Sequence, residues 1–249
     1  MGDVFLESVD TTGEKKDANY VCGEIKAIVR RVGPENVVQV CTDNAANMKL
    51  AVRHLQCNYP KVYFQGCAAH SLDLLLHDWG KEAWVEKIVT KAKLVVNFIK
   101  NHHATFAAYM AQSPNLQLIL PAPTRFGSNF LMLDRLFEVR AALGRVVASN
   151  AWTTYMTECQ LKGDVKKVEK AQKCVEYIQS QRYWKMAKSW LSMTKPVLKA
   201  LRKFDGKSSA MGRAYWVMQH LEKHVYALKD PPFGLPVLLA RRAEELFDK

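Results

Sequence analysis

The period of the hydrophobic pattern changes once along this chain, near Gly66, and this change limits the folds that the chain can adopt. Before Gly66, short apolar runs alternate with helix-like stretches. After Gly66, apolar residues recur at helical spacing almost to the end of the chain. We therefore predict an α/β layer over residues 1–78 and a mostly α-helical domain over residues 79–249.

The first part reads as three short strands that alternate with two helices. The strands are predicted over residues 4–9, 36–41 and 61–66, and the helices over about 13–33 and 43–57. The second and third strands are rich in β-branched or aromatic residues, which favour buried strands. A β-α-β-α-β order is typical of parallel strand pairs.

The second part contains its strongest amphipathic pattern in residues 83–103. The apolar stripe of this segment consists of Val85, Ile88, Val89, Ala92, Val95, Val96 and Ile99. Further helices are predicted over 129–147, 163–194 and 213–228. Pro196 is expected to end or kink the second of these three.

The excess of positive charge is concentrated in one segment. The chain has a formal net charge of +12, and residues 160–203 hold twelve basic residues against three acidic ones. Such a segment attracts polyanions, of which nucleic acid is the commonest in a cell, or is simply a solvated helix face. Lys166, Lys170 and Lys173 recur at three- and four-residue spacing, so their charges share one face and could contact phosphates together.

Cysteine spacing and hydropathy restrict the compartment. The six cysteines are loosely spaced and include no CxxC pair, which favours reduced thiols in an intracellular protein. No run of about 18 apolar residues occurs, so we expect no membrane partner.

Three residues are candidates for metal chemistry. Asp43 lies where a predicted strand meets a predicted helix, so it could bind Mg²⁺ or cap the helix. Cys67 and His70 are three positions apart, which allows both to bind one zinc ion together with two further ligands. His102 and His103 are the nearest candidates for those ligands. Ordinary buried packing is the alternative for Cys67.

Four motifs in this order resemble hAT-type transposases over about residues 1–227: VVQVCTDNAANM, YPKVYFQGCAAHSLDLLL, PAPTRFGSNFLML and PVLKALRKFDGKSSAMGRAYWVM. The resemblance implies an RNase H-like core that holds catalytic carboxylates and is interrupted by a helical insertion. Asp43 matches the second catalytic Asp of the family, and an intact member would use Mg²⁺ in two-metal phosphodiester chemistry. No residue matches the first Asp or the Glu. We therefore expect an incomplete core, a chain truncated at both ends, and a vestigial Asp43.

The resemblance also suggests roles for two further pairs of residues. Cys67 and His70 match the family's C-x-x-H signature, which implies a position at the hinge between core and insertion. Arg125 and Phe126 stand where the family has Arg and Trp, which implies phosphate contact by the guanidinium and stacking of a base on the ring. A plain loop before a helix capped by Ser128 is the alternative.

These observations together predict a truncated or domesticated hAT-like transposase fragment. We expect it to bind DNA without sequence preference, to lack catalysis by itself, and to be nuclear, as the resemblance implies. One alternative is a piece of an active DNA transposase whose remaining carboxylates come from a longer gene product. The other alternative is a protein-interaction module built from the helical part.

Overall fold

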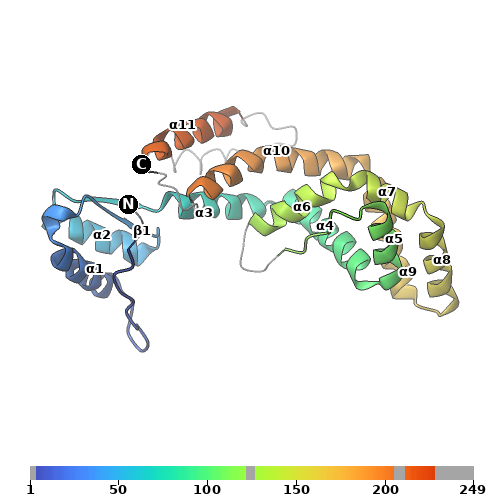
Figure 1. The fold of residues 1–249 in the computed structure, drawn as a ribbon, viewed down its shortest axis with the longest axis horizontal. Helices are drawn as coiled ribbons and strands as arrows, with labels where there is room; N and C mark the ends of the chain where they lie inside the picture. Colours follow the sequence, from blue (N-terminus) through green and yellow to red (C-terminus); the bar gives the residue numbers. More distant parts are fainter. Residues whose placement is uncertain (1–3, 122–126, 205–210, 228–249) are drawn as a thin grey trace. The chain divides into compact units, whose positions relative to one another are not determined.

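The protein is predominantly α-helical in the computed structural model, which describes residues 4–121, 127–204 and 211–227 (Figure 1). The chain divides into two compact units, Met1–Ser71 and Leu72–Lys249, called unit 1 and unit 2 below. The prediction of an α/β, incomplete RNase H-like core is wrong, because the described part of the chain contains only two short parallel strands.

Unit 1 is built on one β-α-β crossover. Strands β1 and β2 pair in parallel, with Gln39 opposite Tyr63 and Thr42 opposite Gly66. A parallel pair needs a crossover connection, and a helix supplies it here. The elements are α1 (Ala18–Val32), η1 (Pro34–Asn36), β1 (Gln39–Thr42), α2 (Ala46–Asn58) and β2 (Tyr63–Gly66).

The core of unit 1 is small. It is formed where α1 and α2 pack together, and Phe64 of β2 packs against the same cluster. Ala51 and Leu55 of α2 are its fully buried members. Helix α1 begins after Asp17, whose side chain accepts from the backbone N–H groups of Asn19 and Tyr20. Unit 1 therefore depends on few apolar contacts.

The strand predicted over residues 4–9 is absent, and this prediction is wrong. Val4 and Phe5 are each 80% exposed, and residues 4–9 have no regular secondary structure. A strand requires a partner with which to exchange backbone hydrogen bonds. In the described residues β1 and β2 pair with each other, and neither pairs with this segment.

All regular secondary structure in the described part of unit 2 is helical, and residues 113–121 form an irregular connection. Its elements are α3 (Ala68–Gly80, which begins in unit 1), α4 (Ala83–Asn101), α5 (His103–Gln112), α6 (Gly127–Glu138), α7 (Arg140–Val147), α8 (Asn150–Leu161), α9 (Val165–Gln179), α10 (Gln181–Phe204) and α11 (Met211–Ala227). None of the described helices is both long and apolar enough to cross a membrane.

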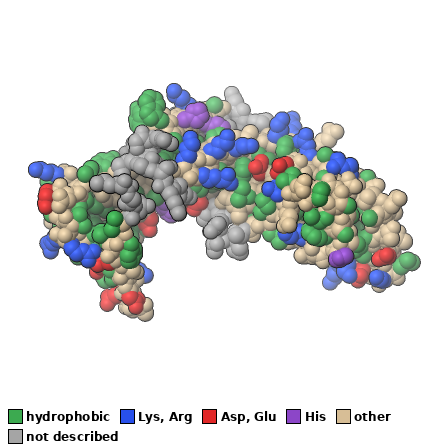
Figure 2. All heavy atoms as spheres, viewed as in Figure 1, with side chains coloured by type: hydrophobic (Ala, Val, Ile, Leu, Met, Phe, Trp, Pro, Cys, Tyr) green, Lys and Arg blue, Asp and Glu red, His purple; other side chains and the backbone are tan. Residues whose placement is uncertain are grey.

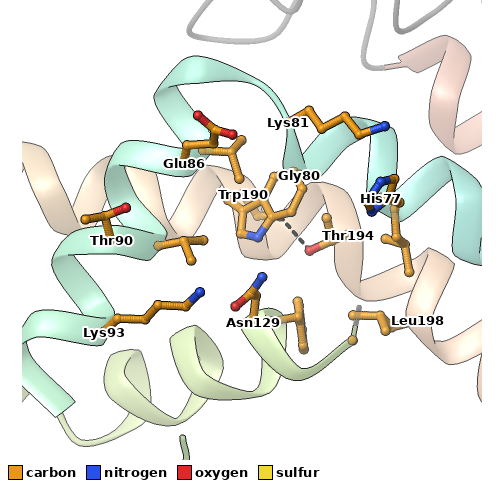
Figure 3. Close-up of a pocket in the computed structure, with 15 residues that line it drawn as sticks. His77, Gly80, Lys81, Glu86, Thr90, Lys93, Asn129, Trp190, Thr194 and Leu198 are labelled. Atoms are coloured by element: carbon orange, nitrogen blue, oxygen red, sulfur yellow. Dashed lines mark hydrogen bonds between the residues drawn. The ribbon is translucent and has the colours of Figure 1, made fainter. Parts of the chain in front are cut away.

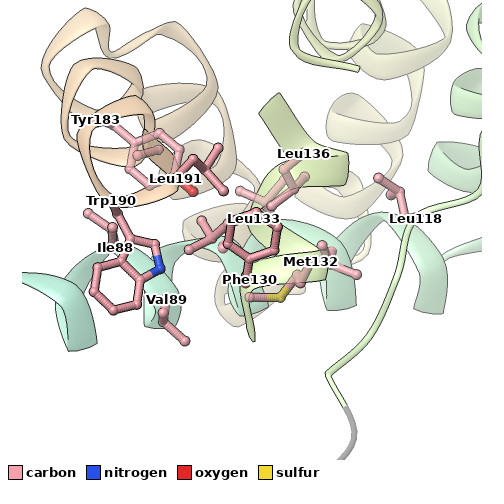
Figure 4. Packing of buried hydrophobic residues seen from close by; sticks show 14 of the residues in the cluster. Ile88, Val89, Leu118, Phe130, Met132, Leu133, Leu136, Tyr183, Trp190 and Leu191 are labelled. Atoms are coloured by element: carbon pink, nitrogen blue, oxygen red, sulfur yellow. The ribbon is translucent and has the colours of Figure 1, made fainter. Parts of the chain in front are cut away.

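Helix α4 packs against four other helices of unit 2 through the stripe that its sequence pattern predicted. All seven residues of the predicted stripe are buried, and α4 packs against α5, α6, α9 and α10. Figure 4 shows part of this core from close by: Ile88 and Val89 of α4 belong to one apolar cluster with Phe130 and Leu133 of α6. Trp190 and Leu191 of α10 belong to the same apolar cluster.

The basic segment forms two helices, so the prediction of one helix over residues 163–194 is wrong. The break lies at Ser180, whose Oγ accepts from the N–H of Tyr183 at 3.2 Å and so caps α10. Helix α10 then continues through Pro196 to Phe204. Pro196 provides no N–H to the carbonyl of Ser192, but Ser192 is exposed, so water can hydrate that carbonyl.

Candidate nucleic-acid interface

Asp43 lies in the loop between β1 and α2, and its side chain is exposed. Its Oδ1 accepts a hydrogen bond from the N–H of Ala45 at 2.9 Å. This bond to a residue two positions ahead forms a local turn. Helix α2 begins only at Ala46, and the residue at its cap position, Ala45, has no capping side chain. Asp43 therefore shapes the entry to α2 without being its N-cap.

The same loop is tied to the start of α3 by a short chain of hydrogen bonds. Asn44 Nδ2 donates to Ser71 Oγ at 2.6 Å, and Ser71 Oγ donates to the carbonyl of Cys67 at 3.1 Å. Gly66 permits this approach, because a Cβ there would lie 1.9 Å from Asn44 Oδ1. Asn44, Gly66 and Ser71 were not predicted as site residues, although all three lie inside the quoted motifs.

Cys67 and His70 lie at the start of α3, and both are half-buried. The N–H of Cys67 donates to the carbonyl of Thr42 at 2.7 Å, which extends the pairing of the two strands by one residue. Partial burial raises the pKa of the Cys41 thiol, and the neighbouring Cys67 thiol raises it further. Cys41 therefore favours the neutral form, not the thiolate that binds metal or acts as a nucleophile.

The sequence suggested Asp43, Cys67 and His70 as metal ligands. Within the described ranges, no three His, Cys, Asp or Glu side chains are grouped so as to hold a metal ion. Zinc at Cys67 and His70 and Mg²⁺ at Asp43 stay predictions. The boundary between the two units follows Ser71, one residue after His70.

The three lysines predicted to contact phosphate lie on α9. Lys166, Lys170 and Lys173 are all exposed, and their spacing keeps them on one side of the helix. Glu169 and Glu176 are exposed on the same helix at neighbouring positions. These carboxylates reduce the local positive potential that the three lysines create.

Helix α10 has a longer row of cations. The sequence of α10 contains no Asp or Glu. Its basic residues are all exposed: Arg182, Lys185, Lys188, Lys195, Lys199, Arg202 and Lys203. Most of them are three, four or seven positions apart, which places them along one side of the helix. Figure 2 shows Lys and Arg side chains gathered over the part of unit 2 where α10 runs.

This row, called the α10 stripe below, extends from Arg182 to Lys203. With a rise of about 1.5 Å per residue it is about 32 Å long. These residues belong to the basic segment recognised in the sequence, but only lysines of α9 were predicted to contact phosphate. The signal that distinguishes α10 was present in the sequence, because an amphipathic helix of 24 residues without an acidic residue is unusual.

Arg125 and Phe126, the predicted phosphate and base contacts, lie outside the described residues. The next residue in the sequence, Gly127, begins α6. Ser128 is buried in the first turn of α6. The roles predicted for Arg125 and Phe126 therefore stay predictions.

A comparison with known families supports part of the resemblance. Residues 1–95 match a family described as a domain of unknown function, DUF659. This domain is found in hAT-like transposase-related proteins. The match includes unit 1 and continues into α4, so it covers less of the chain than the resemblance does. A search of curated proteins found no match.

Proposed function

We propose that this transposase-related chain binds nucleic acid through phosphate contacts made by the α10 stripe, with a smaller contribution from α9. The observation that carries the proposal is the row of seven exposed cations on a helix without an acidic residue. Such a cationic row attracts a polyanion, because no carboxylate of the same helix competes for its charges.

The chemistry of the stripe predicts how it binds. Five of its seven cations are lysines, and a lysine ammonium is a point charge that binds phosphate without reading base edges well. Binding is therefore sequence-independent and weak, with a dissociation constant on the order of 10⁻⁴ to 10⁻⁶ M near physiological salt.

The test is a triple replacement in the stripe, Lys188→Gln, Lys195→Gln and Lys199→Gln. Fluorescence anisotropy with a random-sequence duplex measures its affinity near 0.1 M salt. We expect the affinity to fall at least about tenfold, because each lost phosphate contact also removes the favourable release of counterions from the DNA.

The matched control removes the same charge from unit 1, at the exposed residues Lys15, Lys49 and Lys61. Its affinity should change much less than that of the α10 variant. Equal losses in the two variants would mean that net charge, and not the stripe, determines binding.

A protein-interaction surface is the second candidate, supported by two aromatic side chains on α11. Tyr215 and Trp216 are 65% and 70% exposed, and their rings meet edge to face with centroids 5.8 Å apart. Exposed Tyr and Trp are the residue types that dominate protein interfaces. If the α10 variant binds DNA unchanged while Trp216→Ala abolishes capture of a protein partner, this second function replaces the first.

A further inference from the structure

A cavity of about 520 Å³ lies inside unit 2, where the turn between α3 and α4, the start of α6 and the middle of α10 meet (Figure 3). This volume falls within the range of about 300–1,000 Å³ that small-molecule sites occupy. The apolar lining comes from Leu76, Val85, Val89, Phe130 and Leu198. The cavity can therefore cover the apolar body of a small ligand.

The polar lining of the cavity is rich in donors. Lys93 extends toward Asn129, whereas the carboxylate of Glu86 points away from the centre (Figure 3). Lys81 also lines the cavity, but it pairs with Asp78 at 3.1 Å. The first residue of α6, Gly127, places the positive end of that helix dipole at the same wall. This combination favours an anionic group.

Trp190 provides the second observation that points to a ligand. The residue is only 5% exposed, and its indole Nε1 has no hydrogen-bond partner. Figure 3 shows this nitrogen pointing toward Asn129. A buried N–H without an acceptor is unfavourable, and most such groups in proteins are paired. An acceptor oxygen at this position would complete the site.

We propose that this cavity binds a small organic phosphate. The phosphate oxygens accept from Lys93 and from the Trp190 N–H, which becomes accessible when Asn129 rotates. The organic body, a ring in the simplest case, packs on Val89 and Phe130. A phosphate suits the site better than a carboxylate because its three oxygens can accept from Lys93 and from Trp190 and still face the N-terminus of α6 at Gly127. The site is separate from the α10 stripe, so it does not depend on the proposed function.

Phenyl phosphate is the simplest probe, because it combines one ring with one phosphate. It is titrated into the full chain while the six indole N–H resonances are followed by ¹H–¹⁵N NMR. The variant Trp190→Phe identifies the resonance of Trp190 by its disappearance. We expect the chemical shift of this resonance to change and to reach a plateau as phenyl phosphate saturates the site. Phenol offers only the ring and inorganic phosphate only the phosphate, so each should bind at least about tenfold more weakly.

A pair of variants on α4 tests the role of charge. Lys93→Gln should weaken the binding of phenyl phosphate at least about tenfold. Lys87→Gln removes the same charge from the same helix, but Lys87 is exposed and does not line the cavity, so binding should be unchanged. Circular dichroism checks that both variants fold. The proposal is overturned if no saturation is seen, if the Trp190 resonance does not move, or if both variants lose affinity equally.

Discussion

At the scale of single residues, the clearest constraint in unit 1 is the contact between Gly66 and Asn44. A side chain at Gly66 would collide with Asn44 Oδ1, which belongs to the carboxamide that donates to Ser71. The carboxamide is at the end of a rotatable side chain, so it would turn away and lose that bond. Gly66 thus permits the tie between the β1–α2 loop and α3.

We predict that Gly66→Ala destabilises unit 1 by about 1 kcal/mol, the net contribution of one hydrogen bond. Native-state hydrogen exchange at the amides of Tyr63 and Cys67 measures this, because both donate between the strand segments. The same substitution in an Asn44→Ala background should cost almost nothing, since the collision is gone.

The control for this prediction is Gly23→Ala in α1. A Cβ on Gly23 would meet no atom within 4 Å, and the residue lies inside a helix. This change should therefore stabilise unit 1 by roughly 0.5–1 kcal/mol. Destabilisation by both alanines, or by neither, would contradict the account of Gly66.

At the scale of elements, a prediction succeeded where the sequence pattern of a segment determines the structure of that segment by itself. The stripe of α4 was predicted residue by residue, because helical hydrogen bonds are local and only the apolar face needs a partner. The strand predicted over residues 4–9 failed, because a strand needs a partner that its own sequence does not specify. The break at Ser180 was missed, although Ser is a preferred capping residue.

The candidate site was predicted only in part, because contacts between segments that are distant in the sequence do not follow from the pattern of either segment. The sequence located the basic segment and the loop at Asp43. It did not reveal that the β1–α2 loop is tied through Asn44 to Ser71, 27 positions away. The cavity beside Trp190 was not predictable either, because its walls come from helices that are distant in sequence and meet only after folding.

The helices α9 and α10 should differ in their contributions to nucleic-acid binding. We predict that replacing Lys166, Lys170 and Lys173 by Gln lowers affinity less than the equal replacement on α10, because Glu169 and Glu176 already offset α9. Lys167 is also partly neutralised by Asp164 at 2.6 Å, and this pairing raises the pKa of Lys167. Anisotropy at one salt concentration compares the two triple variants. A larger loss on α9 would contradict the assignment of the main contact to α10.

At the scale of the whole molecule, the two units differ greatly in the size of their cores. Among the described residues, the cluster of unit 1 has seven buried apolar members, whereas the cluster of unit 2 involves every helix from α3 to α11. Because stability rises with the apolar area buried, unit 1 should unfold first.

Urea unfolding can separate the units, because all six tryptophans lie between Trp79 and Trp216, in unit 2. We predict that far-UV circular dichroism begins to change at lower urea than tryptophan fluorescence does. Coincident transitions would indicate a single cooperative unit and contradict the expected order.

The central claim, that the α10 stripe contacts phosphates, is tested most directly by the salt dependence of DNA binding. The logarithm of affinity is measured against the logarithm of salt concentration for the unmodified chain and for the variant with Lys188, Lys195 and Lys199 replaced by Gln. We predict a steep negative slope for the chain and a slope shallower by about 2 to 3 units for the variant, since each phosphate contact contributes about 0.9. Parallel slopes would show that these lysines release no counterions and would contradict the claim.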